Sequence, residues 1–213
     1  MEPKKRRVGA TERDEFLRAA WRFLVAGEID AQRLVFVDEC GTNTSLNPLY
    51  AWSRRGERAY GEAPRNWGSN VTLLASMTRE GMGACIAVEG ATTKAVFEAY
   101  VEEALAPSLR PGQVVVMDNL SSHKGQRMRE LSQRMRELIE GRGCELLFLP
   151  PYSPDLNPIE RAFAKLKASL RRAQARTFRA LIEAMGRGLG EITDQDASGF
   201  FRHCGYRAPA QLL

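Results

Sequence analysis

Short runs of β-branched and aromatic residues follow one another along this chain in an order that leaves few folds open. Two of the runs, at 113–117 and 144–149, alternate with helical segments. The earlier runs are separated by polar segments with glycine-containing turns and predict an antiparallel meander, with strands at 34–37, 50–53, 71–77 and 85–88. A meander followed by alternating strands and helices predicts an α/β fold in which helices cover a mixed sheet.

Helical periodicity accounts for most of the other residues. Apolar residues recur at helical spacing over 11–27, where Thr11 is the expected cap, and again after Thr93. The apolar face predicted for the first of these helices comprises Phe16, Ala19, Ala20, Phe23 and Leu24. Further helices are expected at 124–141, 158–173, 178–188 and 194–203. No linker rich in Gly, Ser or Pro divides the chain, so we expect an N-terminal arm, 1–30, and one domain, 31–213.

A tandem repeat lies within the helix expected at 124–141. Residues 126–132 read QRMRELS, and residues 133–139 read QRMRELI. Seven residues make almost two helical turns, so both copies present their apolar side chains on one face. The repeat therefore predicts a helix that is longer by about 10 Å, and the alternative is that one copy bulges out of the helix.

The net charge of +5 is concentrated in two short segments. Residues 160–172 contain five basic residues and one acidic residue, and residues 2–7 contain four basic residues and one acidic residue. Clustered cations favour a partner that carries phosphates. The N-terminal run PKKRRV is interpretable as a solvated basic tail or stub of a longer protein, or as a nuclear-localisation or nucleic-acid-binding patch.

Cysteine spacing and hydropathy exclude several classes of protein. The four cysteines lie far apart without a C-x-x-C pair, and the chain has two histidines, which argues against a zinc site or a secreted disulfide scaffold. No run approaches the ~18 apolar residues of a membrane helix. The basic N-terminus lacks the apolar segment of a signal peptide. We therefore expect a cytoplasmic protein with reduced thiols and no membrane partner.

Three acidic residues occupy positions that a mixed sheet brings together. Asp38 ends the run LVFVD, Asp118 ends the run VVVMD, and Glu160 opens the helix that follows the next strand. Side chains at the carboxyl ends of neighbouring strands converge on one crevice. Clustered carboxylates repel one another unless a cation neutralises them, and their hard oxygen atoms select Mg²⁺ or Mn²⁺. The pattern suggests a site for two ions that performs phosphoryl transfer.

Each carboxylate also has a structural interpretation. Asp38 and Asp118 can cap turns at the ends of their strands. In the run Asn157-Pro158-Ile159-Glu160, the asparagine is a favoured cap, the proline suits the first helical position, and the glutamate completes a capping box. The residues alone leave both interpretations open.

The segments around the three carboxylates resemble those of a known family. The matching segments are FVDECGTN, YAWSRRGER, VVVMDNLSSHK, LLFLPPYSPDLNPIERAF and GFFRHCGY. They resemble the DDE transposases of the mariner-like superfamily, in particular its bacterial insertion-sequence branch, from about Arg18 to Arg207. The resemblance implies a ribonuclease-H-like fold with a mixed five-stranded sheet flanked by helices. It also implies that Asp38, Asp118 and Glu160 form the catalytic, metal-binding triad.

The same resemblance implies an activity, cofactors and partners. It implies a transposase that cleaves and joins double-stranded DNA at element ends and target with two Mg²⁺ or Mn²⁺ ions. It further implies a homodimer in the active state and an association with the bacterial nucleoid. Relatives carry an N-terminal helix-turn-helix region, so we expect residues 1–30 to be the tail and linker helix that remain of it. A separately encoded helix-turn-helix half is then an expected partner.

Two features depart from the family pattern. Forty-one residues lie between Asp118 and Glu160, seven more than is usual, and seven is the length of the repeat. The longer helix must therefore still return the next strand, and with it Glu160, to the other two carboxylates. Cys40 stands where relatives tend to carry Ser or Thr, a change that a small residue is expected to allow.

Several basic and polar residues near the predicted site are candidates for DNA contacts. Positively charged side chains bind phosphates with little sequence preference. The candidates are Arg54, Arg55, Arg58, Asn119, His123, Lys124, Lys165, Lys167, Arg171 and Arg172. Each of them is also interpretable as a solvated side chain, and Trp52, beside the arginines, is expected in the core.

Two other functions stay open. One is a ribonuclease-H-like nuclease with another substrate, such as an RNA–DNA hybrid or a junction, although the loop PPYSPDLNPIE argues against it. The other is an inactive DNA-binding remnant of a transposase, suggested by the inserted heptad and the missing DNA-reading region.

Overall fold

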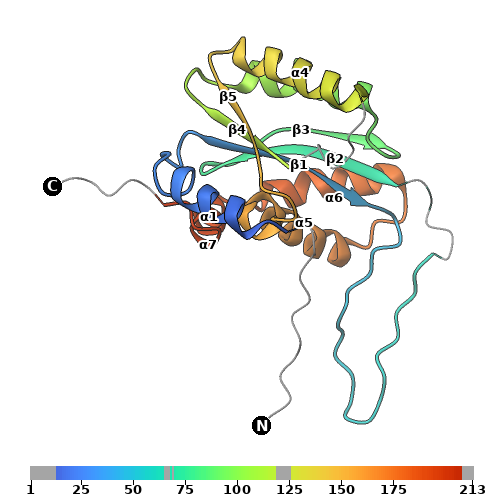
Figure 1. Cartoon of the computed structure of the whole chain (residues 1–213). Coiled ribbons are helices and arrows are strands. Elements are labelled where there is room, and N and C mark those ends of the chain that lie inside the picture. The colour runs from blue at the N-terminus through green and yellow to red at the C-terminus, as the bar shows by residue number, and fades with distance from the viewer. Residues whose placement is uncertain (1–12, 65–67, 69, 119–125, 208–213) are drawn as a thin grey trace, which may run out of the picture.

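A mixed five-stranded sheet forms the centre of the protein (Figure 1). The computed structural model describes residues 13–64, 68, 70–118 and 126–207, without the side chains of 126–130. The strands are β1 (Leu34–Thr42), β2 (Val71–Thr78), β3 (Gly81–Glu89), β4 (Val114–Met117) and β5 (Glu145–Phe148), in the order β3-β2-β1-β4-β5. The β1–β2 and β2–β3 pairs are antiparallel, whereas β1–β4 and β4–β5 are parallel. The predicted mixed five-stranded sheet is confirmed.

Helices cover both faces of the sheet (Figure 1). One face carries α2 (Lys94–Tyr100), the π-helical turn η1 (Val101–Leu105), α3 (Ala106–Ser108) and α4 (Gln126–Glu140). The other carries α1 (Glu15–Leu24), α5 (Ile159–Ala173), α6 (Phe178–Gly190) and α7 (Asp194–His203), and the short 3₁₀ turn η3 (Pro154–Leu156) leads into α5. None of the helices in the described part of the chain has the length and apolar character needed to span a membrane.

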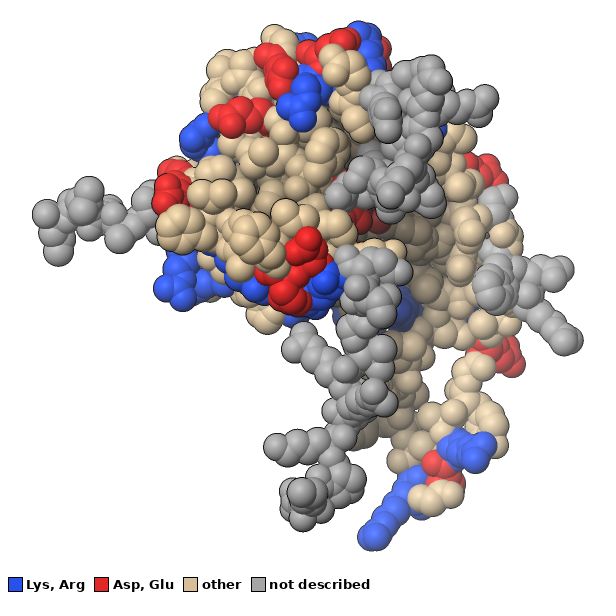
Figure 2. Space-filling model, viewed as in Figure 1, with Lys and Arg blue, Asp and Glu red and all other residues tan. Residues whose placement is uncertain are grey.

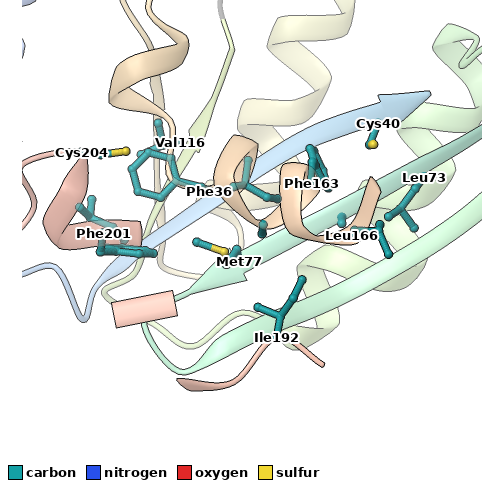
Figure 3. Close-up of a cluster of buried hydrophobic side chains, with 14 of the residues drawn as sticks. Phe36, Cys40, Leu73, Met77, Val116, Phe163, Leu166, Ile192, Phe201 and Cys204 are labelled. Carbon is teal, nitrogen blue, oxygen red and sulfur yellow. The ribbon is translucent and has the colours of Figure 1, made fainter. Parts of the chain in front are cut away.

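Side-chain alternation along β1 divides the core into two layers. Val35 and Val37 pack on the side of α2 and α4, whereas Phe36 packs on the side of α5 and α7 (Figure 3). The ring of Phe36 lies 5.3 Å from that of Phe201 and 5.0 Å from that of Tyr206, measured between centroids. Asp38, two positions after Phe36 on the same strand, therefore also lies on the α5 side of the sheet.

Both copies of the repeat lie in one uninterrupted helix, α4. Leu131, Met135 and Ile139 are buried against the sheet, so the apolar stripe continues along this helix. After α4, β5 returns in parallel register beside β4, with Met117 opposite Phe148. The prediction of a single lengthened helix is confirmed, and the added turns leave the β4–β5 pairing intact.

The N-terminal helix begins later than the sequence predicts. Asp14 caps α1 by accepting hydrogen bonds from the backbone N–H groups of Phe16 and Leu17, at 2.9 and 3.0 Å. Thr11, the expected cap, lies outside the described residues. A capping carboxylate also interacts favourably with the helix dipole, which explains why the first turn starts here.

The face that α1 buries also differs from the prediction. Phe16 and Phe23, both expected to face the core, are 81% and 68% exposed. Arg18 and Trp21 are buried in their place. Both of these side chains find polar partners in the domain, and such specific contacts outweigh the simple apolar pattern of the helix.

A long loop takes the place of the strand predicted at 50–53. Residues 43–64 leave β1 without regular pairing and extend away from the body of the protein, and basic side chains stand near the far end of this loop (Figures 1 and 2). Trp52 is fully exposed, so its predicted place in the core is wrong. A segment with high strand propensity forms a strand only where its backbone can pair with a neighbouring strand. No described strand pairs with this segment.

Arg176, between α5 and α6, holds the base of the 43–64 loop. Its guanidinium donates hydrogen bonds to the backbone carbonyl oxygens of Thr44, at 2.9 Å, and Glu62, at 3.2 Å. It also donates to the side-chain oxygen of Asn47. One side chain thus joins the outgoing and the returning segments of the loop.

We expect Arg176→Ala to loosen the base of this loop while lowering the free energy of unfolding by only about 1 kcal/mol. Trypsin should then cleave after Arg54 and Arg55 several-fold faster, as followed by mass spectrometry over a digestion time course. Arg179→Ala is the matched control, because Arg179 is exposed and pairs with Glu183 on the surface of α6. An equal cleavage rate in both variants would show that other contacts hold the loop.

Candidate active site

The parallel register of β1 and β4 aligns two carboxylates. Val37 lies opposite Met117, so the next residue on each chain is an aspartate, Asp38 or Asp118. Neighbouring strands are about 4.8 Å apart. Asp118 directly follows β4, as predicted, but β1 continues past Asp38 to Thr42 because it still pairs with β2. Asp38 therefore ends the parallel pairing and not the strand.

Glu160 approaches from the helix that covers this side of the sheet. Asp38 and Asp118 each lie two residues beyond a side chain of the α5-side core, Phe36 and Val116 respectively. Alternation along a strand turns them to the same side. Glu160 is in the first turn of α5 and is exposed. The sheet and the helix thus bring the three predicted acidic residues to one edge of the molecule.

Asn157 connects the loop before α5 to the first carboxylate. Its side-chain amide donates a hydrogen bond to Oδ2 of Asp38 at 2.8 Å, and the residue is 3% exposed. The N-cap of α5 is Pro158, without a side-chain hydrogen bond, so the predicted capping box of Asn157 and Glu160 is wrong. No local signal in the sequence marked this role, because a proline at the start of a helix is compatible with an asparagine cap before it.

The charges of the three carboxylates affect one another. Burial, together with the negative charges of Glu160 and Asp118, raises the pKa of Asp38 to about 7, although a hydrogen bond from the Glu39 backbone N–H opposes the change. Coulomb interactions decline with distance, so this effect indicates that both other carboxylates lie near Asp38. A cation at this edge would relieve the repulsion and release the proton of Asp38.

The donor atoms fit a hard divalent cation. Within the described residues, no three His, Cys, Asp or Glu side chains stand close enough together to enclose a metal ion. The three carboxylates therefore lie within electrostatic reach of one another without forming a closed ligand set. Oδ1 of Asn157 adds a buried oxygen that has no hydrogen-bond partner among the described residues. Oxygen donors of this kind suit Mg²⁺ or Mn²⁺.

We expect Asp38→Asn to stabilise the metal-free protein above neutral pH. The raised pKa means that the folded state retains a proton that the unfolded chain has already released, so the free energy of unfolding of the unchanged protein falls as pH rises from about 4 to 7. The asparagine carries no charge and removes this loss, which we expect to amount to about 2–4 kcal/mol. Urea unfolding of both proteins in EDTA, at about pH 5 and pH 8, measures this change in the free energy of unfolding.

Glu145→Gln is the control for this measurement, because Glu145 begins β5, at the end of the parallel strands opposite to Asp38. Its unfolding should keep the pH dependence of the unchanged protein. If Asp38→Asn kept that dependence as well, the carboxyl group of Asp38 would not be the one that burial and its neighbours perturb.

Two lysines of α5 have different surroundings. Lys167 lies beside Cys40, where its charge partly offsets the burial that raises the pKa of that thiol. It therefore points toward the stretch of β1 that follows Asp38. Lys165 instead forms an ion pair with Asp196, with Nζ 2.6 Å from Oδ2, and its side chain ties α5 to α7.

The other candidate DNA contacts lie farther out or outside the described residues. Arg171 and Arg172 are in the last turn of α5, and Arg172 pairs with Glu191 at 3.6 Å. The three arginines of the 43–64 loop are exposed. The remaining candidates, Asn119, His123 and Lys124, lie outside the described residues.

The mixed sheet with helices on both faces is an α/β fold of the ribonuclease-H-like class. Residues 33–182 match the model of the family described as DDE superfamily endonuclease, and the chain belongs to this family. The comparison with curated proteins found no match.

Solved structures of the Mos1 transposase share this fold. The Mos1 strand transfer complex has 17% identity and a TM-score of 0.69, over 96% of this chain and 63% of that chain. The Mos1 mariner paired end complex with Mn has 18% identity and a TM-score of 0.69, over 96% and 64%. The Mos1 catalytic domain with Raltegravir and Mg has 17% identity and a TM-score of 0.55, over 90% and 85%. The chain thus spans less than two thirds of the Mos1 chains in the complexes, and the predicted ribonuclease-H-like fold is confirmed.

Proposed function

We propose that this chain is the catalytic domain of a transposase of the bacterial insertion-sequence branch, cleaving DNA strands and transferring them to a target. The observation that carries the proposal is the alignment of Asp38 with Asp118 across the parallel β1–β4 pair, with Glu160 close enough to raise the pKa of Asp38. Domain boundaries follow from the same proposal, with a tail and linker helix at 1–30 and the catalytic domain at 31–213.

The three carboxylates would hold two Mg²⁺ or Mn²⁺ ions. When bound, the ions would activate the attacking oxygen and stabilise the leaving oxygen. In the first step, the oxygen of water attacks phosphorus, and the bond between phosphorus and the 3′-oxygen breaks to release a 3′-hydroxyl. In the second step, this hydroxyl attacks a target phosphodiester, and the 3′-oxygen of the target strand leaves. Asn157 orients Asp38 through its hydrogen bond during both steps.

Double-stranded DNA is the proposed partner. The Mos1 relatives were solved as a strand transfer complex and as paired end complexes, one of them with the left transposon end. On this chain, Lys167, Arg171 and Arg172 on α5 and the arginines of the 43–64 loop supply cations for phosphate contacts. A homodimer, a separately encoded helix-turn-helix half and a nucleoid location belong to the same proposal.

Nicking of supercoiled plasmid DNA tests this function. We expect the purified chain to convert supercoiled to open-circular DNA in Mn²⁺ and to do so no longer in EDTA, on an agarose gel. An RNA–DNA hybrid of equal length should be cut far more slowly. Preferential cutting of the hybrid would favour a ribonuclease-H-like nuclease instead, and DNA binding without Mn²⁺ binding would favour an inactive remnant.

A further inference from the structure

The loop before α5 is held by a buried arginine from the N-terminal helix. Nη1 of Arg18 donates to Oγ of Ser153 at 2.6 Å and to Oδ1 of Asp155 at 3.0 Å, and Nη2 donates to Oδ2 of Asp155 at 2.6 Å. Arg18 is 0% exposed, and Ser153 is 3% exposed. The two-pronged pairing fixes the orientation of the carboxylate as well as its distance.

A second contact from α1 reaches the same turn through the C-terminal part of the chain. The indole N–H of Trp21 donates to the hydroxyl of Tyr206 at 2.8 Å, and this hydroxyl donates to the backbone carbonyl oxygen of Leu156 at 2.7 Å. Three residues of the turn, Ser153, Asp155 and Leu156, are therefore held from the side of α1. The residue that follows them is Asn157, which bonds Asp38.

Backbone hydrogen bonds within the turn couple the position of Asp155 to that of Asn157. Within η3, the backbone N–H of Leu156 donates to the carbonyl of Ser153 at 2.9 Å, and that of Asn157 donates to the carbonyl of Pro154 at 3.1 Å. The loop enters this turn through Tyr152, whose φ of 52° lies in the left-handed region. A tyrosine in that region is strained and persists where the surroundings hold the backbone in place. Movement of Asp155 would therefore be passed to Asn157.

The cost of burying Arg18 indicates that its ion pair with Asp155 fixes the position of the loop more than it stabilises the fold. Burying an arginine costs much of what pairing it returns, so such a pair is a weak source of stability, and removing one partner leaves an uncompensated charge. Nε of Arg18 has no hydrogen-bond partner in the described part of the chain, although Oε2 of Glu15 lies 3.5 Å away. Arg22 also approaches Asp155, at 3.6 Å, but its side chain is half exposed. Arg18 is thus the arginine of α1 whose position depends most on the loop.

We infer that Arg18 is a positioning residue for the carboxylate site: through Ser153 and Asp155 it sets Asn157 against Asp38 and sets the start of α5, which carries Glu160. The inference rests on the proposed function in one respect, that these carboxylates bind the ions. It makes α1 part of the active site's support, so a change in the docking of α1 changes the affinity of the site for metal.

The test compares Arg18→Gln with Arg22→Gln, which removes the neighbouring, exposed arginine. In the metal-free protein, we expect the side-chain amide signals of Asn157 in a ¹H–¹⁵N NMR spectrum to shift in Arg18→Gln and to stay in place in Arg22→Gln. Substitution of groups that orient metal ligands typically weakens binding by 10–100-fold, so we expect the Mn²⁺ dissociation constant to rise about tenfold or more in Arg18→Gln. Arg18→Lys should restore little of the lost Mn²⁺ affinity, since lysine lacks the planar guanidinium group that donates two parallel hydrogen bonds.

Ser153→Ala keeps the inference testable if Arg18→Gln fails to fold, because it removes one of the two loop groups that Arg18 holds and leaves the ion pair with Asp155 in place. We expect it to shift the Asn157 signals and weaken Mn²⁺ binding in the same direction. Unchanged Asn157 signals and unchanged Mn²⁺ affinity in the folded variants would overturn the inference while leaving the proposed function standing. If the unchanged protein bound no Mn²⁺, the proposed function would fail, and the Asn157 signals would still decide the role of Arg18.

Discussion

Asp118→Asn is expected to lower the rate of Mn²⁺-dependent nicking of supercoiled DNA by about 10³-fold. Metal ligation supplies several kcal/mol of stabilisation for the charge that develops in phosphoryl transfer, and each 1.36 kcal/mol is a factor of ten in rate. Asparagine preserves the shape of the side chain but removes the charge that would hold an ion beside Asp38. Because Asp118 is exposed, the fold should keep its stability. Initial rates at saturating Mn²⁺ measure the effect.

Glu145→Gln is the matched control for the loss at Asp118. Glu145 begins β5, at the opposite end of the parallel strands, and pairs with Arg33 on the surface. Its nicking rate should stay within about twofold of the unchanged protein, since exposed ion pairs contribute little. A variant with Asp118→Asn that nicked DNA at the full rate would contradict the assignment of this residue to the catalytic site.

Phe36→Ala is expected to lower the free energy of unfolding by about 3–5 kcal/mol. Phe36 is fully buried in the layer between the sheet and α5 and α7, where its ring lies beside that of Phe201 (Figure 3). The ring of Phe36 also contacts that of Tyr206. Removing the ring leaves a cavity at the point where α7 and the C-terminal aromatic residues meet β1. Domains are stable by only about 5–15 kcal/mol, so the variant should unfold at a much lower urea concentration.

Phe23→Ala is the matched control for Phe36→Ala, because it removes the same side chain from an exposed position. Phe23 belongs to the exposed face of α1, so its removal should change the free energy of unfolding by less than about 0.5 kcal/mol. Equal losses in the two variants would mean that α1 buries the face predicted from the sequence and not the face that carries Arg18 and Trp21.

The sheet and the acidic edge were predictable because they depend on local patterns that agree with one another. Asp38 and Asp118 each follow an unbroken apolar run that is typical of a buried parallel strand, and the parallel pairing of β1 and β4 aligns them. The repeat in α4 was also interpretable, since seven residues preserve the helical face. In these places the local pattern and the tertiary contacts favour the same structure.

The remaining features depend on partners that are distant in sequence. The segment 50–53 has the composition of a strand but no neighbouring strand among the described residues, and α1 turns its apolar stripe outward because Arg18 and Trp21 bond the loop and Tyr206. Asn157 resembles a helix cap until its contact with Asp38, more than a hundred residues earlier, is known. No window of sequence contains such contacts, so periodicity and capping rules alone could not predict them.

A crystal of the protein grown with Mn²⁺ tests the central claim most directly, through anomalous scattering from the metal. We expect two peaks about 3.5–4 Å apart, with carboxylate oxygens of Asp38 and Asp118 about 2.1 Å from the ions and Glu160 completing the ligands of one of them. Asp118→Asn crystals should lose both peaks. Peaks elsewhere on the molecule, with Asp38, Asp118 and Glu160 free of metal at saturating Mn²⁺, would contradict the assignment of this edge as a phosphoryl-transfer site.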